Sequence, residues 1–315
     1  MTAKQPKSPQ FNIVQKIWRE VKRPFLRPFR KMSSRIAKLE TELKNVTVRL
    51  SRITPQASIG ALSIQITRHC NLNCRFCGTF SPLAESEFVS LDVFEKDIKR
   101  LSELTLGYIN TIAIVGGEPL LHPDCIKFLE ITRKYFPDSI VNLITNGILL
   151  PRQNDNFYRT CAENNIVIAP TKYPIKVDWD KVQADCKKHS VKFEFISNTE
   201  KEVKTMWLRV LDLAGKQDPR KSFMNCQLAN SCIQLVSGKL CTCCVPTNIR
   251  HFNKYFNKNL VTTELDYIDI HKAKDYNEIL TFLAKPIPFC KYCKATQWQY
   301  ELEWQPSKKV IEEWT

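Results

Sequence analysis

The sequence predicts an α/β protein in which about six parallel β/α units lie between a helical arm and a cysteine-rich C-terminal segment. Short apolar runs alternate with amphipathic helical patterns from residue 61 to about residue 225. An apolar seam with steps of three and four precedes this region, and seven of the thirteen cysteines follow it. These observations divide the chain into an arm (residues 1–57), a core (residues 58–225) and a C-terminal domain (residues 226–315).

The arm carries a heptad pattern and most of the positive charge. Its seam is formed by Phe29, Met32, Ile36, Leu39, Leu43, Val46, Leu50 and Ile53, a spacing typical of a coiled coil. Upstream, one helical face is predicted to hold Val14, Ile17, Trp18 and Val21. Residues 1–55 hold 14 Lys or Arg and three acidic residues, which is +11 of the chain's +15. We expect the arm to pack on the core, to dimerise as a coiled coil, or to lie in a membrane interface.

Composition and charge exclude several classes of protein. The chain has no run of about 18 apolar residues that suggests a membrane span, and its N-terminus lacks a signal-peptide pattern. We therefore expect a cytoplasmic protein, peripheral at the inner membrane face if the arm is interfacial. The arm's charge leaves only +4 for the rest of the chain, so no nucleic-acid partner is expected. Thirteen cysteines in such a chain favour metal ligation over disulfides.

The core is expected to alternate strands and helices. Strands are predicted for residues 61–67, 111–115, 140–145, 166–169, 191–196 and 207–213. Helices are predicted for residues 90–106, with Ser90 as N-cap, and for residues 123–135, 155–164 and 178–189. Six such units are too few for a closed eight-stranded barrel.

Three cysteines directly follow the first predicted strand. Cys70, Cys74 and Cys77 form a C-x3-C-x2-C pattern. Structural zinc normally takes four ligands, and no fourth cysteine lies nearby. Thiolates hold [4Fe–4S] clusters, and a cubane held by three leaves one iron open for a chelating ligand. The spacing therefore predicts an iron–sulfur site.

Ligand-type residues also follow the second and third predicted strands. Gly116, Gly117 and Glu118 follow one strand, and Thr145 and Asn146 follow the next. Paired glycines allow a ligand close to the backbone and leave amide groups to bind it. Because ligands of parallel β/α folds bind at the carboxyl ends of strands, all three motifs are expected to meet at one site.

With these motifs the chain resembles the radical S-adenosylmethionine (radical SAM) superfamily. The resemblance implies a partial (β/α)6, TIM-like barrel in which the open iron chelates S-adenosylmethionine. Reductive cleavage would then yield a 5′-deoxyadenosyl radical that abstracts hydrogen from a substrate, with a flavodoxin- or ferredoxin-type protein as electron donor. It further implies that Gly116, Gly117 and Glu118 contact the amino group of this cofactor. Phe76 would lie near its adenine, and Thr145 or Asn146 near its ribose or carboxylate.

The C-terminal domain resembles the SPASM and twitch domains of that superfamily. Its resemblance rests on the Cys232, Gly238, Cys243 segment and on the pair Cys290 and Cys293. It implies one auxiliary iron–sulfur cluster on Cys232, Cys243, Cys290 and Cys293, with Cys226 as a substitute or extra ligand; a zinc ribbon on the same thiolates is the alternative. Two further cysteines, Cys241 and Cys244, are candidate hydrogen donors. The closing segment, residues 298–315, resembles radical SAM proteins associated with bacterial surface-polysaccharide assembly, or is a short amphipathic helix.

The sequence leaves several functions open. We expect a radical SAM oxidoreductase or epimerase that dehydrogenates or epimerises a carbohydrate or sugar conjugate. The alternatives are radical modification of a peptide and a non-catalytic metal-binding protein on the same fold. RNA modification is disfavoured by the small charge outside the arm.

Overall fold

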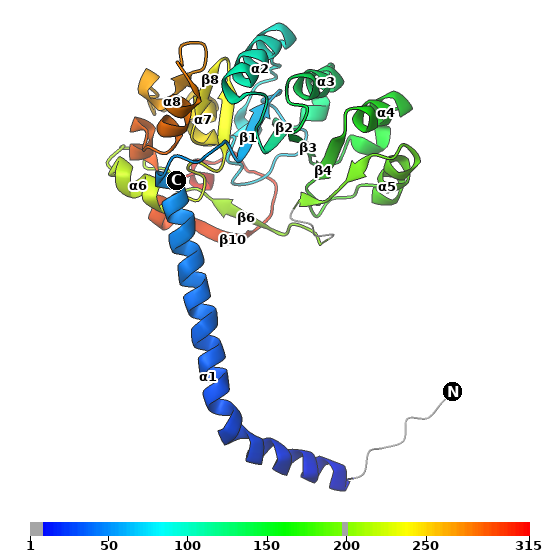
Figure 1. The fold of residues 1–315 in the computed structure, drawn as a ribbon, viewed down its shortest axis with the longest axis vertical. Helices are drawn as coiled ribbons and strands as arrows, with labels where there is room; N and C mark the ends of the chain where they lie inside the picture. Colours follow the sequence, from blue (N-terminus) through cyan, green and yellow to red (C-terminus); the bar gives the residue numbers. More distant parts are fainter. Residues whose placement is uncertain (1–8, 197–200) are drawn as a thin grey trace. The chain divides into compact units, whose positions relative to one another are not determined.

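The computed structural model describes residues 9–196 and 201–315, with side chains from residue 31 onward. The chain forms two compact units that divide between Ser51 and Arg52. The first is helical, and the second contains the strands and all the cysteines. Figure 1 shows the elements with their labels.

Helix α1 (Pro9–Ile53) forms the arm, as the heptad pattern predicts. The described seam residues, from Met32 to Ile53, have exposed fractions between 39% and 67%. The side chains of Phe29 and of the upstream face of Val14, Ile17, Trp18 and Val21 lie outside the described residues. In the described part of the chain, no helix is long and apolar enough to cross a membrane. The role of the arm stays a prediction.

The larger unit is built on one eight-stranded sheet. The strands are β1 (Ala61–Gln65), β2 (Thr111–Val115), β3 (Ile140–Thr145), β4 (Ile166–Pro170), β5 (Lys192–Phe193), β7 (Ile233–Val236), β8 (Lys239–Cys241) and β9 (Ile268–Asp269). Their order is β5-β4-β3-β2-β1-β7-β8-β9. The strands from β5 to β7 pair in parallel, whereas β8 and β9 add antiparallel pairs. An open, mostly parallel sheet confirms the predicted α/β class and partial barrel.

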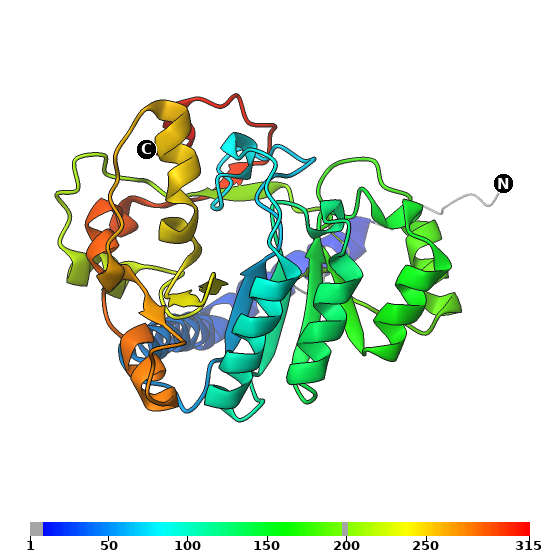
Figure 2. The same cartoon turned by 90° about the horizontal axis from the view of Figure 1, so that it is seen from above.

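Four helices cover one face of the parallel strands (Figures 1 and 2). They are α2 (Leu91–Thr105), α3 (Cys125–Tyr135), α4 (Asp155–Glu163) and α5 (Trp179–Lys188). In α2, Phe94, Ile98 and Leu101 recur at helical spacing and are buried. The predicted cap Ser90 lies at the N-cap of α2 but makes no side-chain cap bond.

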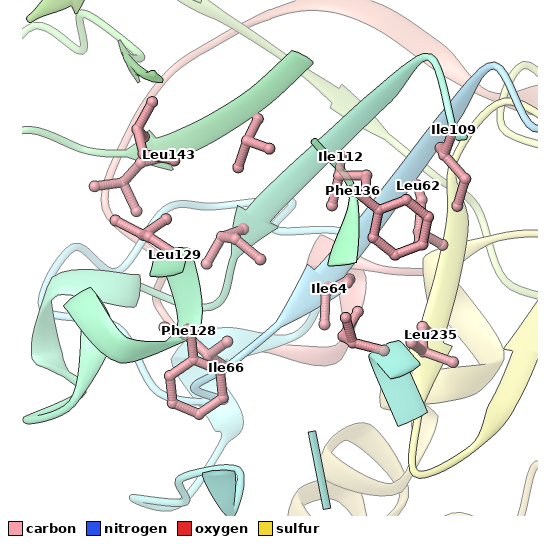
Figure 3. Packing of buried hydrophobic residues seen from close by; sticks show 14 of the residues in the cluster. Leu62, Ile64, Ile66, Ile109, Ile112, Phe128, Leu129, Phe136, Leu143 and Leu235 are labelled. Carbon is pink, nitrogen blue, oxygen red and sulfur yellow. The ribbon is translucent and has the colours of Figure 1, made fainter. Parts of the chain in front are cut away.

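The main apolar core lies between this sheet and these helices. Figure 3 shows Ile66, which follows β1, beside Phe128 of α3. Ile64 of β1 and Leu129 of α3 belong to the same buried cluster. All four are buried, and burying each such side chain contributes about 1.5–3 kcal/mol. The core therefore fixes the strand ends that carry the predicted site.

The sixth strand differs from the prediction. Residues 205–208 form β6 (Thr205–Leu208), which pairs antiparallel with β10 (Gln299–Glu303) in a separate two-stranded sheet. The sixth parallel strand is instead β7, beside β1, because its residues Ile233 and Leu235 are buried in the main core. The main sheet thus continues past residue 225, and the division of the core from the C-terminal domain stays a prediction.

The last third of the chain adds helices and a second apolar cluster. The helices are α6 (Pro219–Asn225), α7 (Cys244–Phe256) and α8 (Tyr276–Leu283). The cluster gathers Phe80, Phe252, Phe289 and Trp314 with most of the C-terminal cysteines. Its largest rings come from both ends of the 52–315 unit, so the C-terminus packs beside the loop that follows β1.

Candidate functional site

The three predicted motifs meet at the carboxyl ends of β1, β2 and β3. One cavity of about 250 Å³ is lined by Cys70, Cys74, Cys77, Gly116, Gly117, Thr145 and Asn146, among others. The parallel pairing of β1 with β2 and of β2 with β3 places these ends side by side. The site therefore lies where ligands of parallel β/α folds bind, at the carboxyl ends of the strands (the strand-end rule).

Glu118 is fully buried and joins the ends of β2 and β3. Its carboxylate accepts hydrogen bonds from the Thr145 hydroxyl (2.6 Å), the Asn146 amide (2.8 Å) and the Leu120 amide (3.1 Å). Burial raises the pKa of Glu118 to about 6, although these hydrogen bonds oppose the rise. Glu118 is not among the residues that line the cavity.

The glycines after β2 pack against the end of β1. A Cβ atom at Gly116 would overlap the Thr67 hydroxyl, and one at Gly117 would overlap the His69 carbonyl. The Gly117 amide, which the sequence suggested was free for a ligand, donates to the Thr67 carbonyl, and the Glu118 amide donates to the His69 carbonyl, both at 3.1 Å. The pair therefore permits close strand packing directly below the cysteine loop.

The three cysteines of the cysteine loop, residues 70–78, all line the cavity. Cys74 is 7% exposed, and Cys70 and Cys77 are half-buried. The Leu72 amide donates to the Cys70 sulfur (3.3 Å), and the Asn146 side-chain amide lies 3.6 Å from the same sulfur. Burial raises the pKa of Cys70 and of Cys74 to about 12. Without a metal these thiols stay protonated, so metal binding would release protons.

This donor set fits a cubane cluster. Among the described residues, no three His, Cys, Asp or Glu side chains converge on a single metal ion. A cubane does not need such convergence, because each of its three thiolates binds a different iron. Three thiols around one cavity with no acidic side chain in its lining match that requirement.

The adenine contact at Phe76 stays a prediction. The Phe76 ring is 4% exposed and belongs to the second apolar cluster, with the Arg75 guanidinium 4.5 Å from the ring centroid. Phe76 is absent from the cavity lining among the described residues.

The seven C-terminal cysteines gather in and around the second apolar cluster. The predicted ligands Cys226, Cys232, Cys243, Cys290 and Cys293 all belong to or pack against it, together with Cys241 and Cys244. The Cys232 thiol lies within hydrogen-bonding reach of the Cys244 thiol, and the Cys243 thiol lies within hydrogen-bonding reach of the Cys241 thiol. Burial raises the pKa of Cys290 to about 12. The auxiliary ligand set stays a prediction.

The two candidate hydrogen donors lie in different surroundings. Cys241 ends strand β8 with no exposed surface. Cys244 lines the same cavity as the cysteine loop, and its sulfur is 3.8 Å from the Gly78 carbonyl oxygen. Geometry therefore favours Cys244 of the two.

Among the residues at this cavity or its thiols that sequence reasoning missed are Tyr173, Met206, Arg209 and Trp304. Arg209 is the one charged side chain in the lining, and in the described part of the chain its buried Nε has no hydrogen-bond partner. The strand-end rule applied to β4 would have indicated Tyr173. Nothing in the local sequence marks Arg209 or Trp304, because their positions depend on the pairing of β6 with β10.

The part of the chain that carries this site is similar to a known protein family. The family model of the Radical SAM superfamily matches residues 64–169, which include the cysteine loop and the ends of β1 to β3. Residues 64–169 are thus similar to the Radical SAM superfamily, whose cofactors are a [4Fe–4S] cluster and S-adenosylmethionine.

Individual relatives share this part of the chain. A GTP 3′,8-cyclase of Sulfurovum sp. is 32% identical over 95 residues, which are 30% of this chain and 29% of the relative. Molybdenum cofactor biosynthesis protein 1 of Dictyostelium discoideum is 34% identical over 104 residues, which are 31% of this chain and 16% of the relative. The chain spans less than a third of the length of these curated relatives.

Solved structures are similar at low identity. BtrN in complex with AdoMet and 2-DOIA has a TM-score of 0.46 and 17% identity, over 76% of this chain and 94% of that chain. Native anSMEcpe with bound AdoMet has a TM-score of 0.34 and 24% identity, over 43% of each chain.

Proposed function

We propose that this protein reductively cleaves S-adenosylmethionine at a [4Fe–4S] cluster held by Cys70, Cys74 and Cys77. One observation carries the proposal: these thiols and the ends of β2 and β3 line the same cavity. When bound, the cluster and S-adenosylmethionine supply one-electron cleavage of the sulfonium to methionine and a 5′-deoxyadenosyl radical, which abstracts hydrogen from the substrate.

The residues of the chain hold and orient these groups. Glu118 acts indirectly, because its buried carboxylate fixes Thr145 and Asn146 at the end of β3. The Asn146 side-chain amide lies 3.6 Å from the Cys70 sulfur, and Asn146 lines the cavity, so it would help to hold the cofactor there. Arg209 supplies a cation for a carboxylate or phosphate, since the lining holds no acidic side chain to neutralise it.

We propose a sugar conjugate as the substrate. Arg209, the one charged side chain in the described lining, supports a conjugate that carries an anionic group. A role in surface-polysaccharide assembly, which the closing segment suggested, is part of this proposal. A second candidate is the cyclisation of a nucleotide, which is favoured by the 32% identity to a protein named GTP 3′,8-cyclase. A nucleotide is itself an anionic sugar conjugate, so both candidates agree on the chemistry at Arg209. A peptide substrate and a non-catalytic metal protein are the remaining alternatives from the sequence.

The outcome of hydrogen abstraction separates dehydrogenation from epimerisation. Dehydrogenation needs an electron acceptor, and an auxiliary cluster on the C-terminal cysteines would serve. Epimerisation needs a hydrogen donor, and of Cys241 and Cys244 the better candidate is Cys244, because it lines the cavity with its sulfur 3.8 Å from the carbonyl oxygen of Gly78, another lining residue. Turnover in deuterated water distinguishes them: one deuterium retained at the inverted carbon indicates epimerisation, and a product two mass units lighter without deuterium indicates dehydrogenation.

The test of the proposal is production of 5′-deoxyadenosine by anaerobically reconstituted protein under strong reduction. Replacing Cys70, Cys74 and Cys77 together by Ala should abolish it. The matched control is Cys161→Ala, since Cys161 is a buried cysteine of α4 in the main core and should leave cleavage intact. Cleavage at the wild-type rate by the triple variant would refute the proposal.

A further inference from the structure

The C-terminal segment, residues 304–315, is bonded to the cysteine loop through its backbone. Pro306 forms an isolated antiparallel bridge with Cys74. The Arg75 amide donates to the Gln305 carbonyl (2.9 Å), and the Ser307 amide donates to the Asn73 carbonyl (2.8 Å). This segment, which we call the strap, therefore holds the backbone on both sides of Cys74.

The side chains of Glu313 and Trp314 bond the C-terminal end of the strap to the cysteine loop and to the rest of the strap. The Trp314 indole N–H donates to the Cys77 carbonyl at 2.9 Å, and the Trp314 ring is buried. The fully buried Glu313 carboxylate accepts hydrogen bonds from the Lys308 amide (2.8 Å) and the Ser307 hydroxyl. It also lies 3.8 Å from the Arg75 guanidinium. Instead of the amphipathic helix considered from the sequence, residues 304–315 contain only a short 3-10 turn, Ile311–Glu313.

The strap brings one hydrogen-bond donor to a sulfur. The Trp304 indole N–H donates to the Cys74 sulfur at 3.2 Å. The Tyr173 hydroxyl lies within hydrogen-bonding reach of the same sulfur, and the two rings are 6.0 Å apart. Cys74 thus has two donors from segments far apart in the sequence, the ends of β4 and β10.

We propose that Trp304 is a positioning residue that raises the reduction potential of the cluster on Cys70, Cys74 and Cys77. The inference rests on the proposed function, in which Cys74 is a ligand. An N–H group stabilises negative charge on a thiolate, and hydrogen bonds to cluster sulfurs set reduction potentials. One electron passes from the flavodoxin- or ferredoxin-type donor to the cluster, so the reduced form carries more negative charge. The Trp304 N–H therefore stabilises the reduced form more than the oxidised form.

The test is a redox titration of full-length reconstituted protein, followed by the EPR signal of the reduced cluster. The signal is assigned as the one that the Cys70, Cys74, Cys77 triple variant lacks. Trp304→Phe keeps a ring but removes the donor, so its midpoint potential should be more negative at unchanged iron content. Tyr173→Phe removes the second donor without changing the strap and should shift the potential in the same direction.

The matched control is Trp314→Phe, which removes an indole N–H from the same strap where it bonds a carbonyl rather than a sulfur. Its potential should stay at the wild-type value. An unshifted potential in Trp304→Phe, or equal shifts in both tryptophan variants, would overturn the proposal. Loss of the cluster iron in Trp304→Phe would also overturn it, since that would assign Trp304 a holding role. A triple variant that keeps every EPR signal of the wild type would instead refute the proposed function.

Discussion

Glu118 joins two strand ends through a single buried carboxylate. Its bonds to Thr145 and Asn146 connect the end of β2 to the end of β3 across the floor of the site. The sequence could predict that Glu118 lies at a strand end, because strand ends follow from periodicity. It could not predict that the carboxylate turns toward β3, since that direction depends on packing between neighbouring strands.

We expect Glu118 to make stability depend on pH. Its pKa is raised to about 6 in the folded protein, so the folded state binds this proton more tightly than the unfolded chain does. The contribution is fully present below about pH 4.5 and is lost as the pH rises through about 6, with a size of about 2 kcal/mol. The free energy of unfolding of wild type relative to Glu118→Gln should therefore fall by about this amount between pH 4.5 and 7.

His251 acts in the opposite sense, because burial lowers its pKa to about 4. Its contribution grows as the pH rises from about 4 to 6.5. It is common to wild type and Glu118→Gln, so it cancels in the comparison. A difference between the two proteins that does not change with pH would contradict the role of burial at Glu118.

Gly117 should tolerate no side chain. A Cβ atom there would overlap the backbone of His69, which directly precedes the cysteine loop. Gly117→Ala should lower the free energy of unfolding by about 1–3 kcal/mol, as overpacking does, and should reduce iron incorporation. Gly60→Ala is the matched control, because a Cβ there meets no atom within 4 Å, and its effect should stay within about 0.5 kcal/mol. Equal stability and iron content in both variants would show that strand packing at Gly117 does not support the loop.

At the scale of elements, α1 presents an exposed apolar seam. Placing two lysines in it, by Leu39→Lys with Leu43→Lys, should dissociate a coiled-coil dimer in sedimentation velocity because both positions belong to the a/d seam. The control is Ser34→Lys with Thr41→Lys, which adds the same charge on another face of the helix. If wild type is already a monomer, the dimer is refuted, and salt-dependent binding to anionic vesicles would then support the interfacial alternative.

The sequence predicts the positions of most strands of the core, but not that residues 205–208 pair with a strand near the C-terminus. Strands β1 to β4 are buried apolar runs, which is a local signal, and each was expected at or near its observed bounds. Residues 207–213 show a similar apolar pattern, yet β6 pairs with β10 in a different sheet. Pairing between segments that are far apart in the sequence leaves no periodic signal, and Arg209 and Trp304 at the site follow from that pairing.

At the scale of the whole molecule, two groups of cysteines lie in the 52–315 unit. The first lines the strand-end cavity, and the second lies in and around the second apolar cluster. Wild-type protein should therefore bind about eight irons per chain, and the Cys70, Cys74, Cys77 triple variant about four, by cubane stoichiometry. Metal analysis of both proteins checks this. One zinc per chain, with no iron left in the triple variant, would assign a zinc ribbon to the second group.

We propose that the cluster on Cys70, Cys74 and Cys77 keeps one iron open for S-adenosylmethionine. Its most direct test is electron–nuclear double resonance on reduced protein with S-adenosylmethionine labelled with 15N in its amino group. We expect a 15N coupling to the cluster, because the amino group would bind the open iron, and we expect it in Cys161→Ala as well. If S-adenosylmethionine left the EPR spectrum unchanged and no 15N coupling appeared, S-adenosylmethionine would not bind an open iron of this cluster.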